Sequence, residues 1–238
     1  MIIAAVILAR STSSRYPRKH LGDLGGKPMI VRIIDGLREV RQFDKIILAT
    51  TDKKTDDDLV KVCKNEGILI TRGSEENLLE RNEQIYFEHE IDYEFAISGD
   101  CPFINSEVMR KIALTIRAYP GYDNYSGLQA YSAMPGYLVG ARSKRVMEIM
   151  RKNYEKHKDK GYTAEQFWLA SNEEDMEKLT TRKQVDLSDI LPVTVTPMKM
   201  SIDWNLERLF WNKVIEYLGY YPETVEDFNK AFGGIKEL

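Results

Sequence analysis

The sequence has few residues of the kinds that build disulfide-stapled, zinc-binding or membrane-spanning proteins. Only two of its 238 residues are cysteine, Cys63 and Cys101, and only three are histidine. Two cysteines are too few for a disulfide framework or a structural zinc site. The longest apolar run, Ile2–Ala9, is far shorter than the roughly 20 residues that span a bilayer. No basic segment precedes this run and no cleavage site follows it, so we expect no signal peptide, no membrane span and a cytoplasmic location.

An excess of charge of one sign is also missing. The formal net charge is −3, and the lysines and arginines are scattered among acids along the predicted helices rather than gathered in a stripe. We therefore expect no nucleic-acid partner. No linker rich in Gly and Ser or in Pro divides the chain, and an apolar content of 43% is ordinary for a globular protein. This composition favours one large domain with an insertion.

Strand and helix patterns alternate through the first half of the chain. The predicted strands are Ile2–Leu8, Lys45–Thr50, Gly67–Thr71 and Tyr93–Ser98, and the predicted helices are Pro28–Val40, Asp56–Glu66, Glu75–Glu90 and Glu107–Ala118. Strands separated by helices of about three turns are typical of βαβ units. The pattern therefore predicts an α/β fold with a mainly parallel sheet.

The second half is less regular. The predicted strands are Tyr122–Tyr131, Tyr137–Ala141 and Leu191–Ile202, and the predicted helices are Lys144–Lys156, Asn205–Leu218 and Glu223–Phe232. Between them, the charged stretch Asn172–Lys183 has few apolar residues. We expect it to be a mobile segment or an excursion that contacts a partner.

A cationic loop directly follows the first predicted strand. It contains Arg10, Arg15, Arg18 and Lys19, and the small hydroxyl residues Ser11–Ser14 lie between them. Ligands of open α/β sheets bind outside the carboxyl ends of the strands, and arginine forks and lysine charges suit phosphate oxygens. The loop therefore favours a polyphosphate ligand; the alternative is a solvated surface loop. It is not a Walker A loop, and Gly22–Pro28 is predicted to be a turn into the next helix.

Two aspartates end later predicted strands. Asp100 follows the fourth strand in Ser98-Gly99-Asp100-Cys101-Pro102, and Asp203 follows the last strand. Both would lie at the sheet edge that carries the cationic loop, where carboxylates can hold Mg²⁺ together with phosphate oxygens. The alternatives are a cap or turn role for Asp100 and a helix N-cap role for Asp203. A buried thiol is the better interpretation of Cys101 than a nucleophile.

The order of these motifs resembles the sugar-acid cytidylyltransferases, the enzymes that make CMP-Kdo and CMP-acylneuraminate. The matching blocks are Ala9-Arg10-Ser11-x-x-Ser14-Arg15-x-Pro17-x-Lys19-x-Leu21, Leu24–Ile30, Ile46–Thr50, Arg72-Gly73-Ser74 and Gly99-Asp100-x-Pro102. The chain looks most similar to the spore-coat polysaccharide cytidylyltransferase group, in which Gly-Asp-Cys-Pro and a late element like Ser201-Ile202-Asp203-Trp204 occur. The likeness is strong over residues 1–105, returns at about 196–218 and is thin between.

The resemblance implies a GT-A-like, Rossmann-like three-layer sandwich that uses CTP and Mg²⁺. It divides the single domain 1–238 into a nucleotide-binding half (1–121), an inserted acceptor and dimerisation region (122–190), and a closing strand with C-terminal helices (191–238). An acceptor hydroxyl would attack the α-phosphorus of CTP, and pyrophosphate would leave. Further partners implied are a sugar acid or similar small acceptor, as in cell-surface polysaccharide synthesis, and a second copy of the chain in a homodimer.

The family's motif residues can be carried over to matching positions. The catalytic residues implied are Arg10 and Lys19, which would neutralise the triphosphate, and Asp100. The nucleotide-binding residues implied are Ala9, Ser11, Ser14, Arg15, Arg72 and Ser74. The Mg²⁺ ligands implied are Asp100 and Asp203.

The acceptor half departs from the family pattern. The usual acidic pair is missing from the stretch Leu128–Val139, and Ala164–Trp168 replaces an Arg-Glu-His block. This indicates a cytidylyltransferase with a non-standard acceptor. Two alternatives stay open: a GT-A glycosyltransferase that uses a nucleotide sugar, and a nucleotide-binding protein without turnover. A glycosyltransferase normally has Asp-x-Asp, and the acidic cluster Asp56-Asp57-Asp58 looks like a helix start instead.

Overall fold

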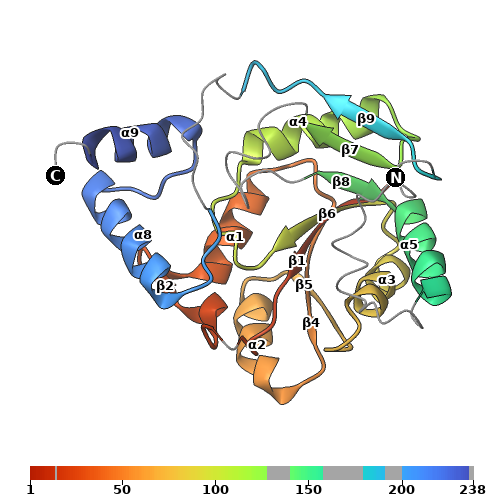
Figure 1. Ribbon diagram of the computed structural model, residues 1–238, viewed down its shortest axis with the longest axis horizontal. Helices are drawn as coiled ribbons and strands as arrows, with labels where there is room; N and C mark the ends of the chain where they lie inside the picture. The colour runs from red at the N-terminus through yellow and green to blue at the C-terminus, as the bar shows by residue number, and fades with distance from the viewer. Residues whose placement is uncertain (14, 128–139, 158–178, 191–199, 236–238) are drawn as a thin grey trace.

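The computed structural model describes residues 1–13, 15–127, 140–157, 179–190 and 200–235, and it is built around one seven-stranded sheet (Figure 1). The strand order across the sheet is β5-β4-β1-β6-β8-β7-β9. The strands are β1 (Ile3–Leu8), β4 (Lys45–Thr51), β5 (Leu69–Gly73), β6 (Tyr93–Ser98), β7 (Asn124–Gly127), β8 (Ala141–Ser143) and β9 (Arg182–Val185). This confirms the predicted α/β fold with a mixed, mainly parallel sheet.

The first strand lies inside the parallel part of the sheet. β1 pairs in parallel with β4 on one side and with β6 on the other, and β4 pairs in parallel with β5. Residues Ile3–Ile7 are fully buried. Because helices cover both faces of such a strand, it reads as a continuous apolar run rather than an alternating one. The carboxyl ends of β1 and β6 therefore meet at one edge, and the cationic loop leaves β1 there.

Helices cover the two faces of the sheet in separate layers. One layer holds α1 (Met29–Arg38), α2 (Asp57–Asn65) and α4 (Ser106–Ala118), and the other holds α3 (Leu78–Glu88) and α5 (Lys144–His157). The two layers pack on different hydrophobic clusters, since side chains alternate between the two faces along each strand. The result is a three-layer arrangement. None of the described helices is long and apolar enough to cross a membrane.

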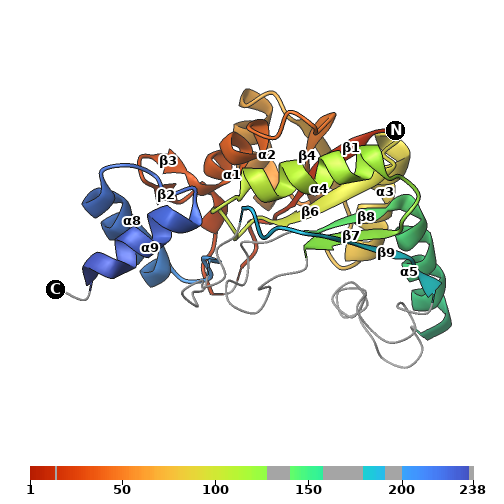
Figure 2. The ribbon, with the colours of Figure 1, turned by 90° about the horizontal axis from the view of Figure 1, so that it is seen from above.

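The last two helices lie together at one end of the molecule, beside β2 (Asp23–Leu24) (Figures 1 and 2). An aromatic cluster joins α8 (Asn205–Leu218) and α9 (Val225–Ile235) to the segment after β6. In this cluster the centre of the Phe103 ring lies 4.2 Å from the centre of the Trp211 ring and 5.5 Å from that of the Phe228 ring. The amide of Gly25 donates to Asn212 Oδ1 at 2.8 Å and ties α8 to the hairpin formed by β2 and β3 (Lys27–Pro28). This packing brings the start of α8 toward the sheet edge.

The predicted turn before the first helix is a hairpin between β2 and β3 (Lys27–Pro28). Its two turn residues, Gly25 and Gly26, have φ values of 60° and 85°. Left-handed backbone at both positions suits glycine and is typical of a tight two-residue hairpin. The prediction of a turn at Gly22–Pro28 is confirmed.

Several expectations for the second half need correction. The charged stretch Asn172–Lys183 ends in a strand, because β9 pairs in parallel with β7, while its residues 172–178 lie outside the described part. The late strand expected over Leu191–Ile202 is not a strand at 200–202, and 191–199 are not among the described residues. The strand expected at Tyr122–Tyr131 is observed as β7 over Asn124–Gly127, with 128–131 outside the description. The strand expected at Tyr137–Ala141 overlaps β8 only at Ala141, with 137–139 outside the description, and β8 continues to Ser143.

Candidate functional site

The cationic loop runs from the end of β1 to a short 3₁₀ helix, η1 (Lys19–Leu21). The carbonyl oxygen of Ser11 accepts hydrogen bonds from the amides of Ser13 and Arg18, both at 3.1 Å. Arg18 has a left-handed backbone with φ 56°, which turns the chain into η1. The loop is thus folded back on itself and held at its first residue.

A buried carboxylate fixes the same residue from the other side. Asp56 is fully buried at the end of the 3₁₀ helix η2 (Lys54–Asp56), and its Oδ1 accepts from the Ser11 amide at 2.6 Å. Its Oδ2 accepts from the hydroxyls of Thr50 at 2.8 Å and Thr51 at 2.5 Å and from the Thr51 amide at 3.1 Å. Burial raises the pKa of Asp56, but these hydrogen bonds outweigh it and the pKa lies below its usual value.

The role of Asp56 was not recognised in the sequence, where it was expected only to begin a helix. Its neighbours Asp57 and Asp58 pair with Arg72 at 2.7 Å and with Arg18 at 2.6 Å. The three aspartates therefore hold protein cations and a backbone amide rather than forming a metal site. The sequence shows only Thr50 and Thr51 at a strand end and the acidic residues Asp56–Asp58 soon after. That pattern does not by itself predict a buried carboxylate that holds the loop.

Opposite charges from distant parts of the chain meet at the end of the loop. The Lys19 Nζ lies 2.8 Å from Asp100 Oδ2 and 3.5 Å from Asp203 Oδ1. The Arg15 Nη2 lies 3.1 Å from the same Asp203 oxygen. The Lys19 side chain is buried, while the two carboxylates are partly open to solvent. The structure thus brings together two residues of the cationic loop and the two aspartates that follow later predicted strands.

Asp100 is held by its own strand end. The Ser98 hydroxyl donates to Asp100 Oδ1 at 2.5 Å, and the Asp100 carbonyl accepts from the Ile202 amide at 2.7 Å. Burial raises the pKa of Asp100, but the hydrogen bonds from Lys19 and Ser98 outweigh burial, and the pKa lies below its usual value. The carboxyl is therefore ionised near neutrality. Cys101 is a buried thiol whose pKa burial raises well above its usual value, which fits the expectation of an inert cysteine.

The start of α8 leaves the Asp203 carboxylate available to these cations. Glu207, one turn into the helix, accepts from the amides of Asp203 at 2.6 Å and Trp204 at 3.0 Å. The N-cap position of α8 is Trp204, one residue after Asp203, so the alternative N-cap role for Asp203 is not observed. The guanidinium of Arg15 also lies 5.9 Å from the centre of the Trp204 ring.

A neutral histidine and a glycine pack beneath the charged residues. The buried His20 donates from Nδ1 to the Gly99 carbonyl at 2.7 Å. Burial, reinforced by the charge of Lys19, lowers the pKa of His20 to about 4. A Cβ on Gly99 would lie 2.6 Å from the Cβ of Ala9 and 3.0 Å from the Leu8 carbonyl oxygen. Glycine is therefore required for β1 and β6 to end this close together.

A cavity of about 410 Å³ opens between the loop and the carboxyl end of β6. We call the part formed by Arg10, Arg15, Lys19 and Asp100 the loop end. We call the part formed by Leu78, Arg81, Ala96 and Arg142 the inner end. The complete lining is Leu8, Ala9, Arg10, Thr12, Ser13, Arg15, Lys19, His20, Leu78, Arg81, Ala96, Ser98, Gly99, Asp100 and Arg142.

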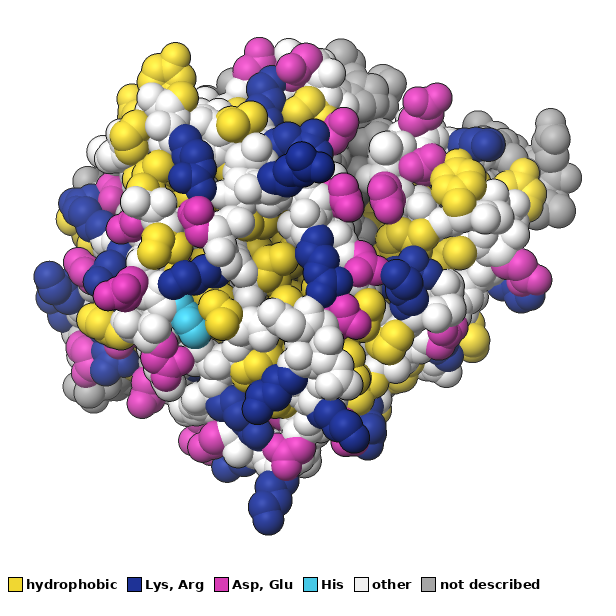
Figure 3. All heavy atoms as spheres, turned by 180° about the vertical axis from the view of Figure 1, so that it is seen from behind, with side chains coloured by type: hydrophobic (Ala, Val, Ile, Leu, Met, Phe, Trp, Pro, Cys, Tyr) yellow, Lys and Arg dark blue, Asp and Glu magenta, His cyan; other side chains and the backbone are white. Residues whose placement is uncertain are grey.

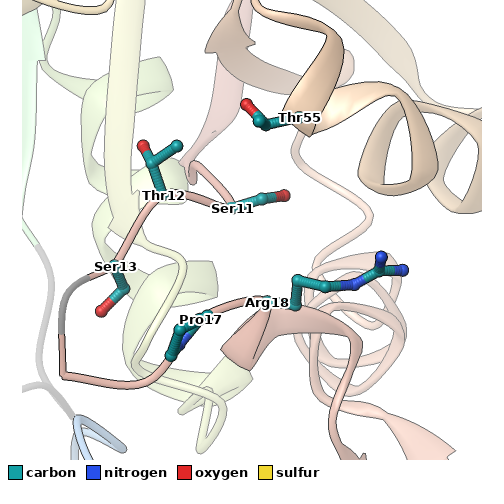
Figure 4. Close-up of a pocket in the computed structure, with 6 residues that line it drawn as sticks. All are labelled: Ser11, Thr12, Ser13, Pro17, Arg18 and Thr55. Atoms are coloured by element: carbon teal, nitrogen blue, oxygen red, sulfur yellow. The ribbon is translucent and has the colours of Figure 1, made fainter.

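A second cavity, of about 550 Å³, lies on the other side of the loop and shares Thr12 and Ser13 with the first. Figure 4 shows Ser11 and Arg18 extending on the side of the loop where Thr55 of η2 lies. On the face of the molecule seen in Figure 3, basic and acidic side chains are interspersed rather than separated by sign. The cationic loop therefore separates the two cavities and lines both of them.

The remaining predicted residues fall into two groups. Ala9 and Arg10 line the first cavity, and Arg10 Nη1 lies 3.9 Å from Glu75 Oε1, which also accepts from the Thr12 hydroxyl at 2.7 Å. Ser74 and Arg72 line neither of the two described cavities. The Ser74 hydroxyl accepts from the Asn77 amide at 3.0 Å, before α3. Ser14 lies outside the described residues.

Arg72 points away from the cavity. Its Nε donates to the Thr51 carbonyl at 2.9 Å, and its Nη2 donates to the Lys53 carbonyl at 2.7 Å. Together with Asp57, these carbonyls engage three of its guanidinium nitrogens in the connection between β4 and α2. Near the same part of the sheet, His89 is half-buried, and its Nε2 lies 2.8 Å from the Thr71 hydroxyl.

The family model for cytidylyltransferases matches residues 4–188, which is more than half of the chain. The chain therefore belongs to the cytidylyltransferase family. Among curated relatives, it is 33% identical over 111 residues to the uncharacterized protein MJ1063 of Methanocaldococcus jannaschii, covering 47% of this chain and 46% of the relative. It is 32% identical over 111 residues to the spore coat polysaccharide biosynthesis protein SpsF of Bacillus subtilis, covering 45% and 46%. The matched stretch spans about half the length of these relatives.

Solved structures support the same fold. A cytidylyltransferase from Leptospira borgpetersenii covers the whole of this chain and 94% of its own, with a TM-score of 0.80 at 18% identity. A CMP:2-keto-3-deoxy-manno-octonic acid synthetase in complex with CTP covers 91% of this chain and 99% of its own, with a TM-score of 0.63 at 17% identity. Rv0371c of Mycobacterium tuberculosis, in complex with manganese, covers 89% and 98%, with a TM-score of 0.56 at 14% identity.

Proposed function

We propose that this protein transfers CMP from CTP to a hydroxyl of a small sugar-acid acceptor and releases pyrophosphate. The observation that carries the proposal is the meeting of Lys19, Arg15, Asp100 and Asp203 at one sheet edge, on a cavity lined by further cations. The acceptor oxygen would bond to the α-phosphorus as the bond to pyrophosphate breaks, and the hydroxyl proton would leave to solvent. Such chemistry depends on alignment and charge neutralisation rather than on a covalent intermediate with the protein.

Three of the loop cations, Arg10, Arg15 and Lys19, would act on the triphosphate. Lys19 is a buried point charge next to Asp100, and Arg10 and Arg15 are exposed guanidiniums that can reorient to a ligand. Because arginine forks bind phosphate oxygens in pairs, these residues would hold the departing pyrophosphate while Lys19 stabilises its growing charge. The loop backbone, fixed through Ser11 by Asp56, would keep the amides close to the nucleotide.

The carboxylates at this edge fit a magnesium ion. Asp100 and Asp203 both contact Lys19, so their oxygens face one small region. Within the described residues no group of three or more His, Cys, Asp or Glu side chains could hold a metal alone. That suits Mg²⁺, which takes one or two carboxylates and completes its shell with phosphate oxygens and water. When bound, Mg²⁺ would neutralise phosphate charge, and Asp100 and Asp203 would hold it.

The acceptor class and the setting rest on the relatives and on the cavity. The curated and structural relatives include a spore coat polysaccharide biosynthesis protein and a synthetase of a CMP-linked sugar acid. We infer a sugar acid or a related anion as the acceptor, in the synthesis of a surface-polysaccharide precursor. The homodimer implied by the resemblance stays a prediction, which light scattering of the purified chain tests.

A pyrophosphate-release screen tests the proposal. It crosses CTP, UTP, ATP and GTP, each with Mg²⁺, against sugar acids, sugar phosphates and phosphorylated alcohols. We expect release with CTP and a sugar acid. Cleavage of a nucleotide sugar without pyrophosphate release would favour a glycosyltransferase. Tight CTP binding with no release for any acceptor would favour a binding protein without turnover.

A further inference from the structure

The inner end of the cavity contains charged groups that the proposed nucleotide chemistry does not use. Along β6, Glu94, Ala96 and Ser98 project to the same face because side chains alternate in a strand. Ser98 and Ala96 line the cavity, and Glu94 lies one step further in, fully buried. The cavity floor therefore runs from Asp100 inward along β6 toward a buried carboxylate.

Arg142 stands beside that carboxylate. In the antiparallel pair of β6 and β8, Arg142 is directly opposite Glu94, and its Nε lies 3.5 Å from Glu94 Oε1. Asn82 of α3 holds Glu94 from the other side, because its Nδ2 lies 2.9 Å from both carboxylate oxygens. Arg142 lines the cavity with its guanidinium side chain about one-fifth exposed. Glu94 thus lies beside the Nε edge of a guanidinium that borders the cavity, and the Nη1 of this guanidinium lies 3.9 Å from Met150 Sδ.

A second guanidinium comes from the opposite wall. Arg81 of α3 is buried, donates from Nη1 to the Ser74 carbonyl at 2.7 Å and lines the same inner end. Leu78 and Ala96 supply the apolar surface there. Two arginines from different elements, one of them fixed by a buried acid, form a cationic recess in an otherwise apolar wall. Burying such an ion pair costs free energy that an apolar pair would not, so the pair is weak evidence for a stabilising role.

We propose that Arg142, oriented by Glu94 and assisted by Arg81, binds the anionic group of the acceptor and so determines acceptor specificity. The inference rests on the proposed function and names the residues that select its second substrate. Arg142 would contact the anion directly, and Glu94 is a positioning residue that acts by orienting Arg142. A carboxylate or a phosphate would satisfy this chemistry, since a guanidinium fork binds either.

Binding measurements separate this inference from the proposed function. Calorimetry would use the full chain with Mg²⁺ and the uncleavable α,β-methylene analogue of CTP, and then add one of three probes. The probes are 3-deoxy-manno-octulosonate, its methyl ester, in which the carboxylate is masked, and glucose 1-phosphate. The variants are Arg142→Gln, Arg142→Lys and Glu94→Gln. The control is Arg151→Gln, which removes an arginine of α5 that pairs with Glu83 and Glu155 away from the cavity.

We expect Arg142→Gln to weaken binding of one anionic probe at least tenfold and to leave the ester and the CTP analogue within twofold. Arg142→Lys should recover part of the loss because it keeps the charge, and Glu94→Gln should give an intermediate loss. The probe affected distinguishes a carboxylate acceptor from a phosphate acceptor. Arg151→Gln should change none of these affinities.

Four results would overturn the inference. Equal losses for acid and ester would mean that Arg142 only shapes the cavity, and a matching loss for the CTP analogue would place it in the nucleotide site. The inference would also be wrong if Arg142→Gln left the affinity for the anionic probes unchanged. It would be wrong as well if neither anion bound to a wild-type protein that binds the CTP analogue. If the wild type failed to bind the analogue, the proposed function would fail, while the same titrations without nucleotide would still test Arg142.

Discussion

The loop end and the inner end of the cavity both carry cations, but they hold them in different ways. At the loop end, Arg10 and Arg15 are about half exposed, and Lys19 contacts carboxylates that lie 81 and 184 positions away in the chain. At the inner end, Arg142 belongs to a strand and pairs with a fully buried glutamate in the neighbouring strand. One end is assembled from a loop, and the other is built into the sheet.

Under the proposed function, this difference would let one cavity serve two ligands. Exposed arginines on a loop exchange their protein partners for phosphate oxygens at little cost, because exposed ion pairs are weak. A guanidinium locked by a buried acid keeps one geometry, and fixed geometry favours selectivity. The loop end therefore suits a common donor such as a nucleoside triphosphate, and the inner end suits a choice among acceptors.

Replacing Lys19 should break the loop end most severely. We expect Lys19→Met to lower pyrophosphate release by about 10²–10³-fold, because it removes a preorganised charge at the site where charge develops. Losing one partner of a buried ion pair can also cost about 3–5 kcal/mol, so thermal unfolding must show that the variant is folded in the assay. Lys27→Met, which removes an exposed lysine paired with Asp35, is the matched control. Retained turnover would remove Lys19 from the mechanism.

The pH dependence of folding should reveal the neutral histidine beneath the loop end. The pKa of His20 is about 4 in the folded protein against 6.5 when unfolded. Because the pKa is lower in the folded protein, protonation of His20 favours the unfolded state. The free energy of unfolding is therefore unaffected by His20 above pH 6.5 and falls as the pH decreases toward 4, by about 3 kcal/mol once His20 is protonated in both states.

His20→Asn keeps the donor to the Gly99 carbonyl and removes this titration. Denaturant unfolding at a series of pH values should therefore show a smaller loss of stability on acidification in the variant than in the wild type. The difference between the two proteins isolates His20 from the carboxylates that also titrate in this range. Parallel pH profiles would contradict a buried neutral histidine.

Asp56→Asn should loosen the loop end without touching the inner end. The amide cannot accept all four hydrogen bonds that the carboxylate accepts, and leaving buried donors unsatisfied costs about 2 kcal/mol. We expect lower stability in urea and a raised KM for CTP, with acceptor binding unchanged. Asp57→Asn, at an exposed neighbour that pairs with Arg72, should have a smaller effect on both. An unchanged KM for CTP would limit Asp56 to a structural role.

Asp100→Asn should have the smallest of the four expected effects, on metal affinity. Because the change also removes a charged partner of Lys19, thermal unfolding must show that this variant is folded in the assay. We expect the affinity for Mg²⁺ in the presence of CTP to fall by about tenfold, or about 1.4 kcal/mol, because one anionic ligand is lost while Asp203 remains. Calorimetry measures this affinity, with Asp44→Asn, at a carboxylate paired with Arg117, as the control. An unchanged Mg²⁺ affinity would show that Asp100 is not a metal ligand.

The helices and strands with strong apolar patterns could be predicted from the sequence. The strand predicted at Tyr93–Ser98 and the helix predicted at Asn205–Leu218 have the observed bounds, since strong apolar patterns and their flanking residues mark both ends. The edge strand β9 was missed because its residues, Arg182–Val185, are mostly polar and carry no apolar alternation. Its pairing is with β7, more than fifty positions earlier in the chain.

The sequence by itself determined the α/β architecture, the cationic loop after β1 and the position of Asp100 just after β6, because these follow from local periodicity and from residue types. Only the tertiary structure decided that Lys19 stands between Asp100 and Asp203, that Arg72 turns toward the β4–α2 connection, and that Asp56 and Glu94 fix the loop and Arg142. Contacts between residues far apart in the chain depend on strand order and register. No local pattern of residues records them.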